Sequence, residues 1–198
     1  MTEPTLYPES GFRRLRIDLA YDGSNFAGWA KQPDQRTVQE CLEEALAKVS
    51  QSTPETIVAG RTDAGVHATG QVIHVDLPES LLLDDLVYKL NRLLDEDIRI
   101  HDISIATGAF HARFSALRRH YRYKILDDNR VLDPLARLDV ATWYRALDVD
   151  VMNKTSQLLL GKHDFAAFCK FREGATTVRT LEKYEWMRNA DGFLVADI

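Results

Sequence analysis

The sequence predicts an α+β fold made of two halves of βαββαβ order, each an antiparallel sheet with its helices on one face. Segments in which every second residue is apolar alternate along the chain with segments whose apolar residues recur at helical spacing. This succession is complete once within the 198 residues and then begins again. Because a chain of that length can form two small domains, we expect an N-terminal domain of residues 1–108 and an incomplete C-terminal domain of residues 109–198.

The first half begins with a strand and a helix. Apolar and polar residues alternate over residues 14–21, as in a half-buried strand. Over residues 38–49 the apolar residues follow helical spacing, and Thr37 with Glu40 can form a capping box at the start of the helix.

The rest of the first half repeats these patterns. Strands are predicted at residues 56–59 and 70–77, a helix at 83–94 and a last strand at 98–105, where the apolar phase shifts at Asp102 as it does at a β-bulge. The order βαββαβ is that of a ferredoxin-like domain, with both helices on one face of the sheet. The other face is then free for a partner.

The second half starts in the same way but stops early. A strand at residues 120–125 precedes a helix from Asp148, its N-cap, to Leu160, with Gly161 as C-cap. Two further strands, 180–188 and 193–198, are joined by an Asp-Gly turn. A βαββ unit leaves a sheet edge and an apolar face uncovered. We therefore expect further C-terminal sequence or another chain to cover them.

The distribution of charge matters more than its sum. A formal net charge of −5 argues mildly against a nucleic-acid partner, because such proteins carry basic patches that neutralise phosphates. Residues 103–126, however, contain no Asp or Glu but carry Arg113, Arg118, Arg119, Arg122 and Lys124. This window is either part of an RNA-binding surface or a solvated strand face, and its composition alone does not decide between them.

No signal peptide opens the chain, and no run of roughly 18 apolar residues could span a membrane, so we expect a cytoplasmic protein without membrane contact. Cys41 and Cys169 form neither a disulfide framework nor a CxxC pair, and we expect two buried, reduced thiols. The six histidines lack the paired spacing of a zinc site. We therefore predict no metal and no cofactor.

The densest group of unusual residues is Gly60 to Ala68, GRTDAGVHA, in the loop between two predicted strands. It is not a phosphate-binding P-loop, since the required Lys and Ser or Thr do not follow and a strand comes next. Arg61 can approach Asp63 and lower the pKa of its carboxyl by about 1 to 3 units, which suits a nucleophile. The spacing alone favours the other interpretation, an Asp that closes a turn.

Tyr121 stands at the start of the strand inside the basic window. An aromatic ring among arginines on an open sheet face can stack on a base, at a gain of roughly 1 to 3 kcal/mol. The alternative is an ordinary core aromatic of a strand.

In these segments the sequence resembles TruA-type tRNA pseudouridine synthases. GRTDAGVHA looks like the signature of that family, and further matches follow in the family's order: Asp22-Gly23 to Gly28-Trp29, Thr37-Val38-Gln39, Phe110 to Arg113, Arg119 to Tyr123 and Gly161 to Phe165. Ala30 replaces a common Gln, and Leu94-Asp95 replaces a usual Leu-Pro. A family segment containing Met-Val-Arg would lie beyond Ile198.

The resemblance implies an activity and a site. The family isomerises uridines at positions 38, 39 and 40 of the tRNA anticodon stem-loop, with a flipped base, without cofactor or metal, and as a homodimer. Asp63 would be the catalytic nucleophile. Tyr121 would stack on the uracil, Arg61 would displace the base or hold the phosphate backbone, and His67 and Arg113 would also bind the substrate.

Two other functions fit the same element order. One is a non-catalytic RNA-binding module that uses a sheet surface, although residues 70–77 lack its stacking aromatics. The other is a small-molecule sensor, which leaves Arg61, Asp63 and the basic window unexplained. We also expect the 198-residue chain by itself to be inactive or poorly soluble.

Overall fold

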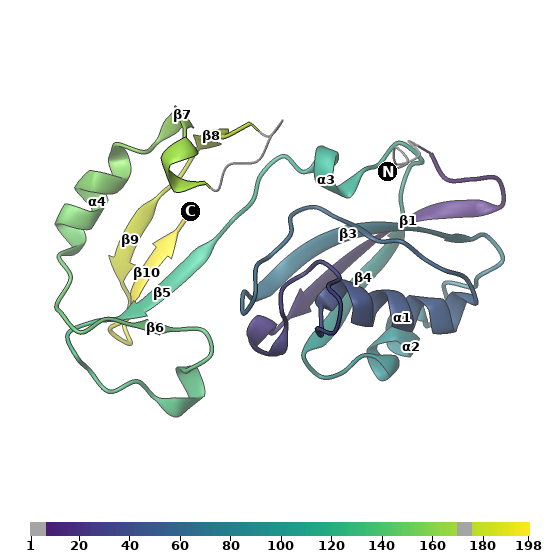
Figure 1. The fold of residues 1–198 in the computed structure, drawn as a ribbon, viewed down its shortest axis with the longest axis horizontal. Coiled ribbons are helices and arrows are strands. Elements are labelled where there is room, and N and C mark those ends of the chain that lie inside the picture. Colours follow the sequence, from purple (N-terminus) through teal and green to yellow (C-terminus); the bar gives the residue numbers. More distant parts are fainter. Residues whose placement is uncertain (1–6, 170–175) are drawn as a thin grey trace. The chain divides into compact units, whose positions relative to one another are not determined.

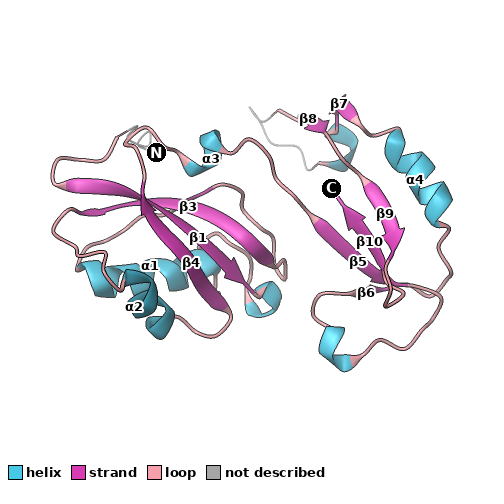
Figure 2. Cartoon of the chain, turned by 180° about the vertical axis from the view of Figure 1, so that it is seen from behind, coloured by secondary structure: helices cyan, strands magenta, loops and turns pink. Residues whose placement is uncertain are grey.

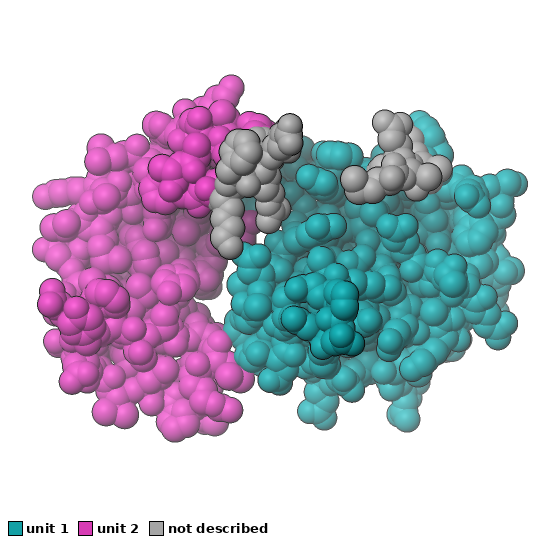
Figure 3. All heavy atoms as spheres, in the orientation of Figure 1, with its two compact units in different colours: residues 1–119 teal, residues 120–198 magenta. Residues whose placement is uncertain are grey.

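A computed structural model describes residues 7–169 and 176–198 of the chain. It divides into two compact units, residues 1–119 and 120–198 (Figure 3). Helices and strands occur in both units, so the predicted α+β class is confirmed. Among the described residues, no helix is long and apolar enough to cross a membrane.

Unit 1 is a four-stranded antiparallel sheet with two long helices. Its strands are β1 (Phe12–Tyr21), β2 (Ile57–Val58), β3 (Ala68–Pro78) and β4 (Ile98–Ile105). They lie in the order β2-β3-β1-β4, and every neighbouring pair is antiparallel. Helices α1 (Val38–Ser50) and α2 (Leu86–Leu93) both cover the same face of this sheet (Figures 1 and 2).

Local signals fixed most of these elements. Thr37 caps α1 by accepting a hydrogen bond on its hydroxyl from the Glu40 backbone N–H. The bulge expected near Asp102 is present, since Asp18 pairs with Asp102 while the next residue, Leu19, pairs with Ile100. Helix α2 begins three residues later than predicted, because Asp85 adopts a left-handed conformation with φ of 60°.

The opposite face of the sheet in unit 1 is not entirely free, contrary to our expectation. The short helix α3 (Ala112–Ser115) lies against β3 on that face, where the Ala112 N–H donates to His74 Nδ1 at 3.1 Å. The buried Arg14 guanidinium pairs with Asp76 at 2.8 Å and donates to the carbonyl oxygens of Gly108 and Phe110. These contacts fasten the segment after β4 to the sheet.

Unit 2 contains a second four-stranded sheet, in the order β6-β5-β10-β9, and a separate two-stranded sheet, β7-β8. The strands are β5 (Arg122–Leu126), β6 (Ala141–Thr142), β7 (Gly161–Asp164), β8 (Val178–Leu181), β9 (Glu185–Arg188) and β10 (Leu194–Asp197). β5 and β6 run parallel, so the prediction of a purely antiparallel sheet is wrong for this unit. The β9–β10 turn lies at the predicted Asp191-Gly192, with Gly192 at φ of 84°.

Two boundaries in unit 2 also differ from prediction. The expected strand 180–188 is two strands, because β8 pairs with β7 whereas β9 pairs with β10. Helix α4 (Val149–Gln157) has the predicted N-cap, Asp148, but ends before Gly161. Gly161, at φ of 95°, instead begins β7.

The two cysteines are free, and their burial differs from prediction. Cys41 is half-buried on α1, and this burial raises the pKa of its thiol. Cys169 is exposed, so the expectation of two buried thiols is wrong for Cys169.

Candidate active site

The loop between β2 and β3 carries Asp63 at its exposed tip. The loop turns where the Val66 N–H donates to the Asp63 carbonyl oxygen at 3.2 Å, with Gly65 at φ of 77°. The turn is therefore closed by the backbone carbonyl of Asp63. Within residues 7–169 and 176–198, no hydrogen bond or ion pair engages its carboxylate. The carboxylate is accessible to a ligand.

Hydrogen bonds from the core hold the base of this loop. The Trp29 N–H donates to the Thr62 carbonyl oxygen at 3.0 Å, and the Tyr21 hydroxyl lies 2.8 Å from the Thr62 hydroxyl. Gln71 donates to the Gly60 carbonyl oxygen at 2.8 Å and to the Tyr21 hydroxyl at 3.2 Å. Burial raises the pKa of the Tyr21 phenol, although its two hydrogen bonds oppose this. Thr62, next to Asp63, is thus fixed through both its backbone and its side chain.

Two glycines let a second loop, which follows β1, lie against the Asp63 loop. A Cβ added to Gly23 would lie 2.1 Å from the Val66 carbonyl oxygen, an impossible approach. A Cβ on Gly28 would lie 2.9 Å from the Thr62 carbonyl oxygen, and its φ of 110° also favours glycine. Backbone therefore packs directly on backbone on both sides of Asp63.

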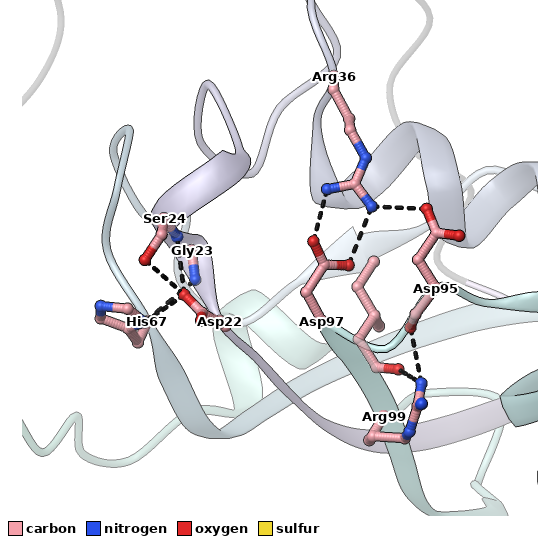
Figure 4. Close-up of polar contacts among 9 residues, drawn as sticks. Asp22, Gly23, Ser24, Arg36, His67, Asp95, Asp97 and Arg99 are labelled. Carbon is pink, nitrogen blue, oxygen red and sulfur yellow. Dashed lines mark hydrogen bonds and ion pairs between the residues drawn. The ribbon is translucent and has the colours of Figure 1, made fainter. Parts of the chain in front are cut away.

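The same two loops are joined by a polar cluster (Figure 4). Asp22 Oδ1 accepts from the Ser24 N–H at 2.9 Å and the Ser24 hydroxyl at 2.6 Å, and it lies 3.0 Å from His67 Nδ1. The Ser24 hydrogen bonds, and to a lesser degree His67, hold the pKa of Asp22 below its usual value. Because Ser24 donates to the carboxylate and not to the imidazole, the cluster is not a nucleophilic Ser-His-Asp triad.

A second ionic cluster fixes the other end of the loop after β1 (Figure 4). Arg36 donates to Asp97 at 2.7 Å and to Asp95 at 2.8 Å, and its guanidinium lies 4.1 Å from the centre of the Phe26 ring. The hydrogen bond to Asp97 is the largest cause of the raised pKa of Arg36. Asp95, at the position where we noted a departure from Leu-Pro, thus supplies Arg36 with a second carboxylate.

The predicted basic residues take different positions. Arg61 is exposed on the Asp63 loop. We had considered that it approaches Asp63, but across the described parts of the chain no ion pair links the two side chains. Arg119 donates to the Ala59 carbonyl oxygen, and its Nε would lie 2.8 Å from a Cβ added to Gly60. Arg113, on α3, places its guanidinium 5.6 Å from the centre of the Phe114 ring.

Tyr121 belongs to unit 2, where it extends β5 by one residue. Its N–H donates to the Ile198 carbonyl oxygen at 2.8 Å, and its carbonyl accepts from the Ile198 N–H at 2.9 Å. The side chain is 56% exposed, so Tyr121 is not an ordinary core aromatic. The ring is available for stacking.

Known proteins match this chain over most of its length. A family profile described as "tRNA pseudouridine synthase" matches residues 19–115. The "tRNA pseudouridine synthase A" proteins of Frankia casuarinae and Streptomyces griseus are each 52% identical to this chain. The matches cover 95% and 96% of this chain and 69% of each relative's own length. That of Mycobacterium leprae is 47% identical over 92% of this chain and 68% of its own length. The chain belongs to the tRNA pseudouridine synthase family.

The part of the chain that matches the family profile includes the Asp63 loop and the loop packed against it, from Asp22 to Trp29. Sequence reasoning noted both loops but missed that they touch, and it missed Tyr21 and Thr62 altogether. The one signal in the sequence was the pair of glycines, Gly23 and Gly28, close together after a strand. In the described residues no group of three or more His, Cys, Asp or Glu side chains is arranged to hold a metal ion.

Proposed function

We propose that this protein isomerises uridine to pseudouridine in tRNA, with Asp63 as the nucleophile. Membership of the tRNA pseudouridine synthase family is the main support for this activity. An exposed carboxylate next to Thr62, which core hydrogen bonds hold through both its backbone and its side chain, supports the role of Asp63, because catalysis needs a reacting group held in one geometry.

The reaction exchanges one glycosidic bond for another. The Asp63 carboxylate adds to the ribose or the base of a flipped uridine, and the bond from C1′ to N1 breaks. The uracil rotates, C5 forms a bond with C1′, the bond to Asp63 breaks and frees its carboxylate, the proton on C5 is lost, and N1 gains a proton. Atoms balance without an oxidant or a metal. Tyr121, exposed on unit 2, stacks on the uracil in this proposal, while Arg61, His67 and Arg113 contact the RNA.

The finer expectations belong to the same proposal. The target uridines are those at positions 38, 39 and 40 of the anticodon stem-loop, and the protein acts in the cytoplasm as a homodimer. The exposed Arg61 and Arg113 support an RNA partner. For unit 1, the element order βαββαβ with the sheet order β2-β3-β1-β4 supports a ferredoxin-like domain, and for unit 2 we keep an incomplete one.

Replacement of Asp63 tests the mechanism. With tRNA tritiated at uridine C5, we expect Asp63→Ala to lower tritium release by about 10⁴-fold or more, because the nucleophile is lost. RNA affinity should stay within about twofold, since one exposed carboxylate adds no attraction for phosphate. Asp84→Ala, at another exposed Asp of unit 1, is the matched control and should keep full turnover.

The outcomes separate the candidate functions. Normal turnover by Asp63→Ala would contradict the mechanism. If the protein binds tRNA but releases no tritium, both as the 198-residue chain and in the longest form that its gene encodes, the non-catalytic RNA-binding module is the better account.

A further inference from the structure

The Nδ1 atom of His67 contacts two groups, one of which requires a proton on this nitrogen while the other requires that it carry none. Its Nδ1 lies 3.0 Å from Asp22 Oδ1 and 3.2 Å from the Gly23 backbone nitrogen (Figure 4). A ring nitrogen that carries a proton donates, and one without a proton accepts. The contact with Gly23 requires an unprotonated Nδ1, whereas the contact with Asp22 requires a protonated one. One proton therefore decides which contact is made.

The contact with the Asp22 carboxylate, which requires the proton, is the more favourable of the two. Two hydrogen bonds from Ser24 keep Asp22 ionised, so it can only accept. An unprotonated Nδ1 would place its lone pair 3.0 Å from an anionic oxygen, which is repulsive. A hydrogen bond to a charged acceptor is about twice as strong as one between neutral groups. Both arguments favour a proton on Nδ1.

The contact is linked to Asp63 through a short run of backbone. Asp22 directly follows β1, and its N–H donates to the Asp97 carbonyl oxygen, next to β4, at 2.9 Å. On the other side, His67 follows Val66, whose N–H closes the turn at the Asp63 carbonyl. Holding His67 thus fixes one end of the turn that carries the nucleophile.

We propose that Asp22 is a positioning residue for the isomerisation: its carboxylate binds the Nδ1–H of His67 and so holds the Asp63 turn in place. This inference rests on the proposed function, in which Asp63 is the nucleophile. Asp22 does not touch the substrate in this account. Its main effect is on the geometry of attack, so it changes kcat much more than KM, to which His67 contributes only one of several RNA contacts.

Asp22 is also the N-cap of the short 3₁₀ helix Gly23–Asn25. A test must separate that role from the contact with His67. Asp22→Asn does so, because Asn is as good an N-cap as Asp but lacks the charge. We expect about a tenfold loss of kcat with KM within about twofold for Asp22→Asn, and about 100-fold for Asp22→Ala, since a small misplacement costs that much. Asp84→Asn, which removes the charge of an exposed Asp of unit 1 outside this cluster, is the matched control and should stay within about twofold of the wild type.

Nitrogen-15 NMR of the histidine rings supplies a readout that a cap alone would not move. His67 should show a protonated Nδ1 in the wild type and lose part of that signal in Asp22→Asn. His74 and His163 are internal references. His74 Nδ1 accepts from a backbone N–H and is therefore unprotonated, and His163 Nε2 lies 2.7 Å from a carbonyl oxygen and therefore carries a proton.

An unprotonated Nδ1 on His67 in the wild type, or wild-type kcat in Asp22→Asn, would overturn the positioning role. The NMR result does not depend on turnover. Normal turnover by Asp63→Ala would instead contradict the proposed function while leaving the state of His67 Nδ1 as measured.

Discussion

The two units of the chain are stabilised in different ways. Unit 1 contains an apolar core in which β1, β3, β4, α1 and α2 all bury side chains. In unit 2 only five hydrophobic residues are buried in the described part, namely Leu126, Val140, Leu194, Val195 and Ala196, while Leu135 is 92% exposed. Unit 2 also contains ion pairs around a buried carboxylate. The loop that carries Asp63, the proposed nucleophile, therefore lies in the unit with the packed core, and a packed core can hold a reacting group in one geometry.

The buried carboxylate of unit 2 is Asp127, which is 1% exposed. Arg188 and Arg130 donate to it at 2.8 and 3.0 Å, and the Leu147 N–H donates at 2.9 Å. The Arg188 hydrogen bonds are the largest reason that its pKa lies far below the usual value. This cluster joins residues 127, 147 and 188, which are far apart in sequence.

The largest contrast should come from the core. Leu46 is fully buried on α1, whereas Leu135 in unit 2 is almost fully exposed. Leu46→Ala should lower the free energy of unfolding of unit 1 by about 4 kcal/mol, because it leaves a cavity, and Leu135→Ala should change that of unit 2 by less than about 0.5 kcal/mol. Hydrogen exchange resolved by unit would measure both. Equal effects would contradict the contrast in packing.

A somewhat smaller effect is expected at the ionic cluster. Asp127→Asn should lower the free energy of unfolding of unit 2 by about 3 kcal/mol, near the low end for a broken buried pair, because Arg188 is itself 39% exposed. Asp139→Asn removes an exposed partner of Lys124 and should cost less than about 1 kcal/mol. Urea unfolding followed by the indole NMR signals of Trp143 and Trp186, separate from that of Trp29 in unit 1, reports on unit 2. Similar losses for the two variants would mean that burial of Asp127 is unimportant.

The smallest effect depends on pH and should affect unit 1. Burial, with a contribution from Arg14, lowers the pKa of His74 from 6.5 to about 4. As the pH falls from 6.5 to 4, the unfolded state binds more protons than the folded state, so stability falls. We expect a loss of about 2.4 kcal/mol between pH 7 and pH 4.5 from this group.

His74→Gln, which keeps a neutral acceptor for the Ala112 N–H, should remove this part of the pH dependence. The Asp127 cluster should lose its stabilisation only as the pH falls below about 3.8, the ordinary pKa of this carboxyl in the unfolded state, because its pKa in the folded protein is lower still. Hydrogen exchange of both units at pH 7 and pH 4.5 would test the difference. A His74→Gln variant with an unchanged pH profile would assign the acid sensitivity to other groups.

The sequence by itself determined the elements whose signals are local. Alternation predicted β1, β3 and β4, Thr37 and Asp148 marked the starts of α1 and α4, and the glycine-rich segment around Asp63 identified the loop that carries the proposed chemistry. Each signal lies within a few residues of the feature that it predicts, so neighbouring side chains suffice to read it.

Only the tertiary structure decided what surrounds Asp63 and where some elements end. The Tyr21–Thr62 and Asp22–His67 contacts span 41 and 45 positions in the chain, and both depend on how β1 and β3 pair. The segment predicted as one strand at 180–188 forms two strands, because its two halves belong to different sheets. Alternation of apolar and polar residues shows that a segment is a strand, but it does not show which strand pairs with it. The contacts that hold Asp63 depend on that pairing.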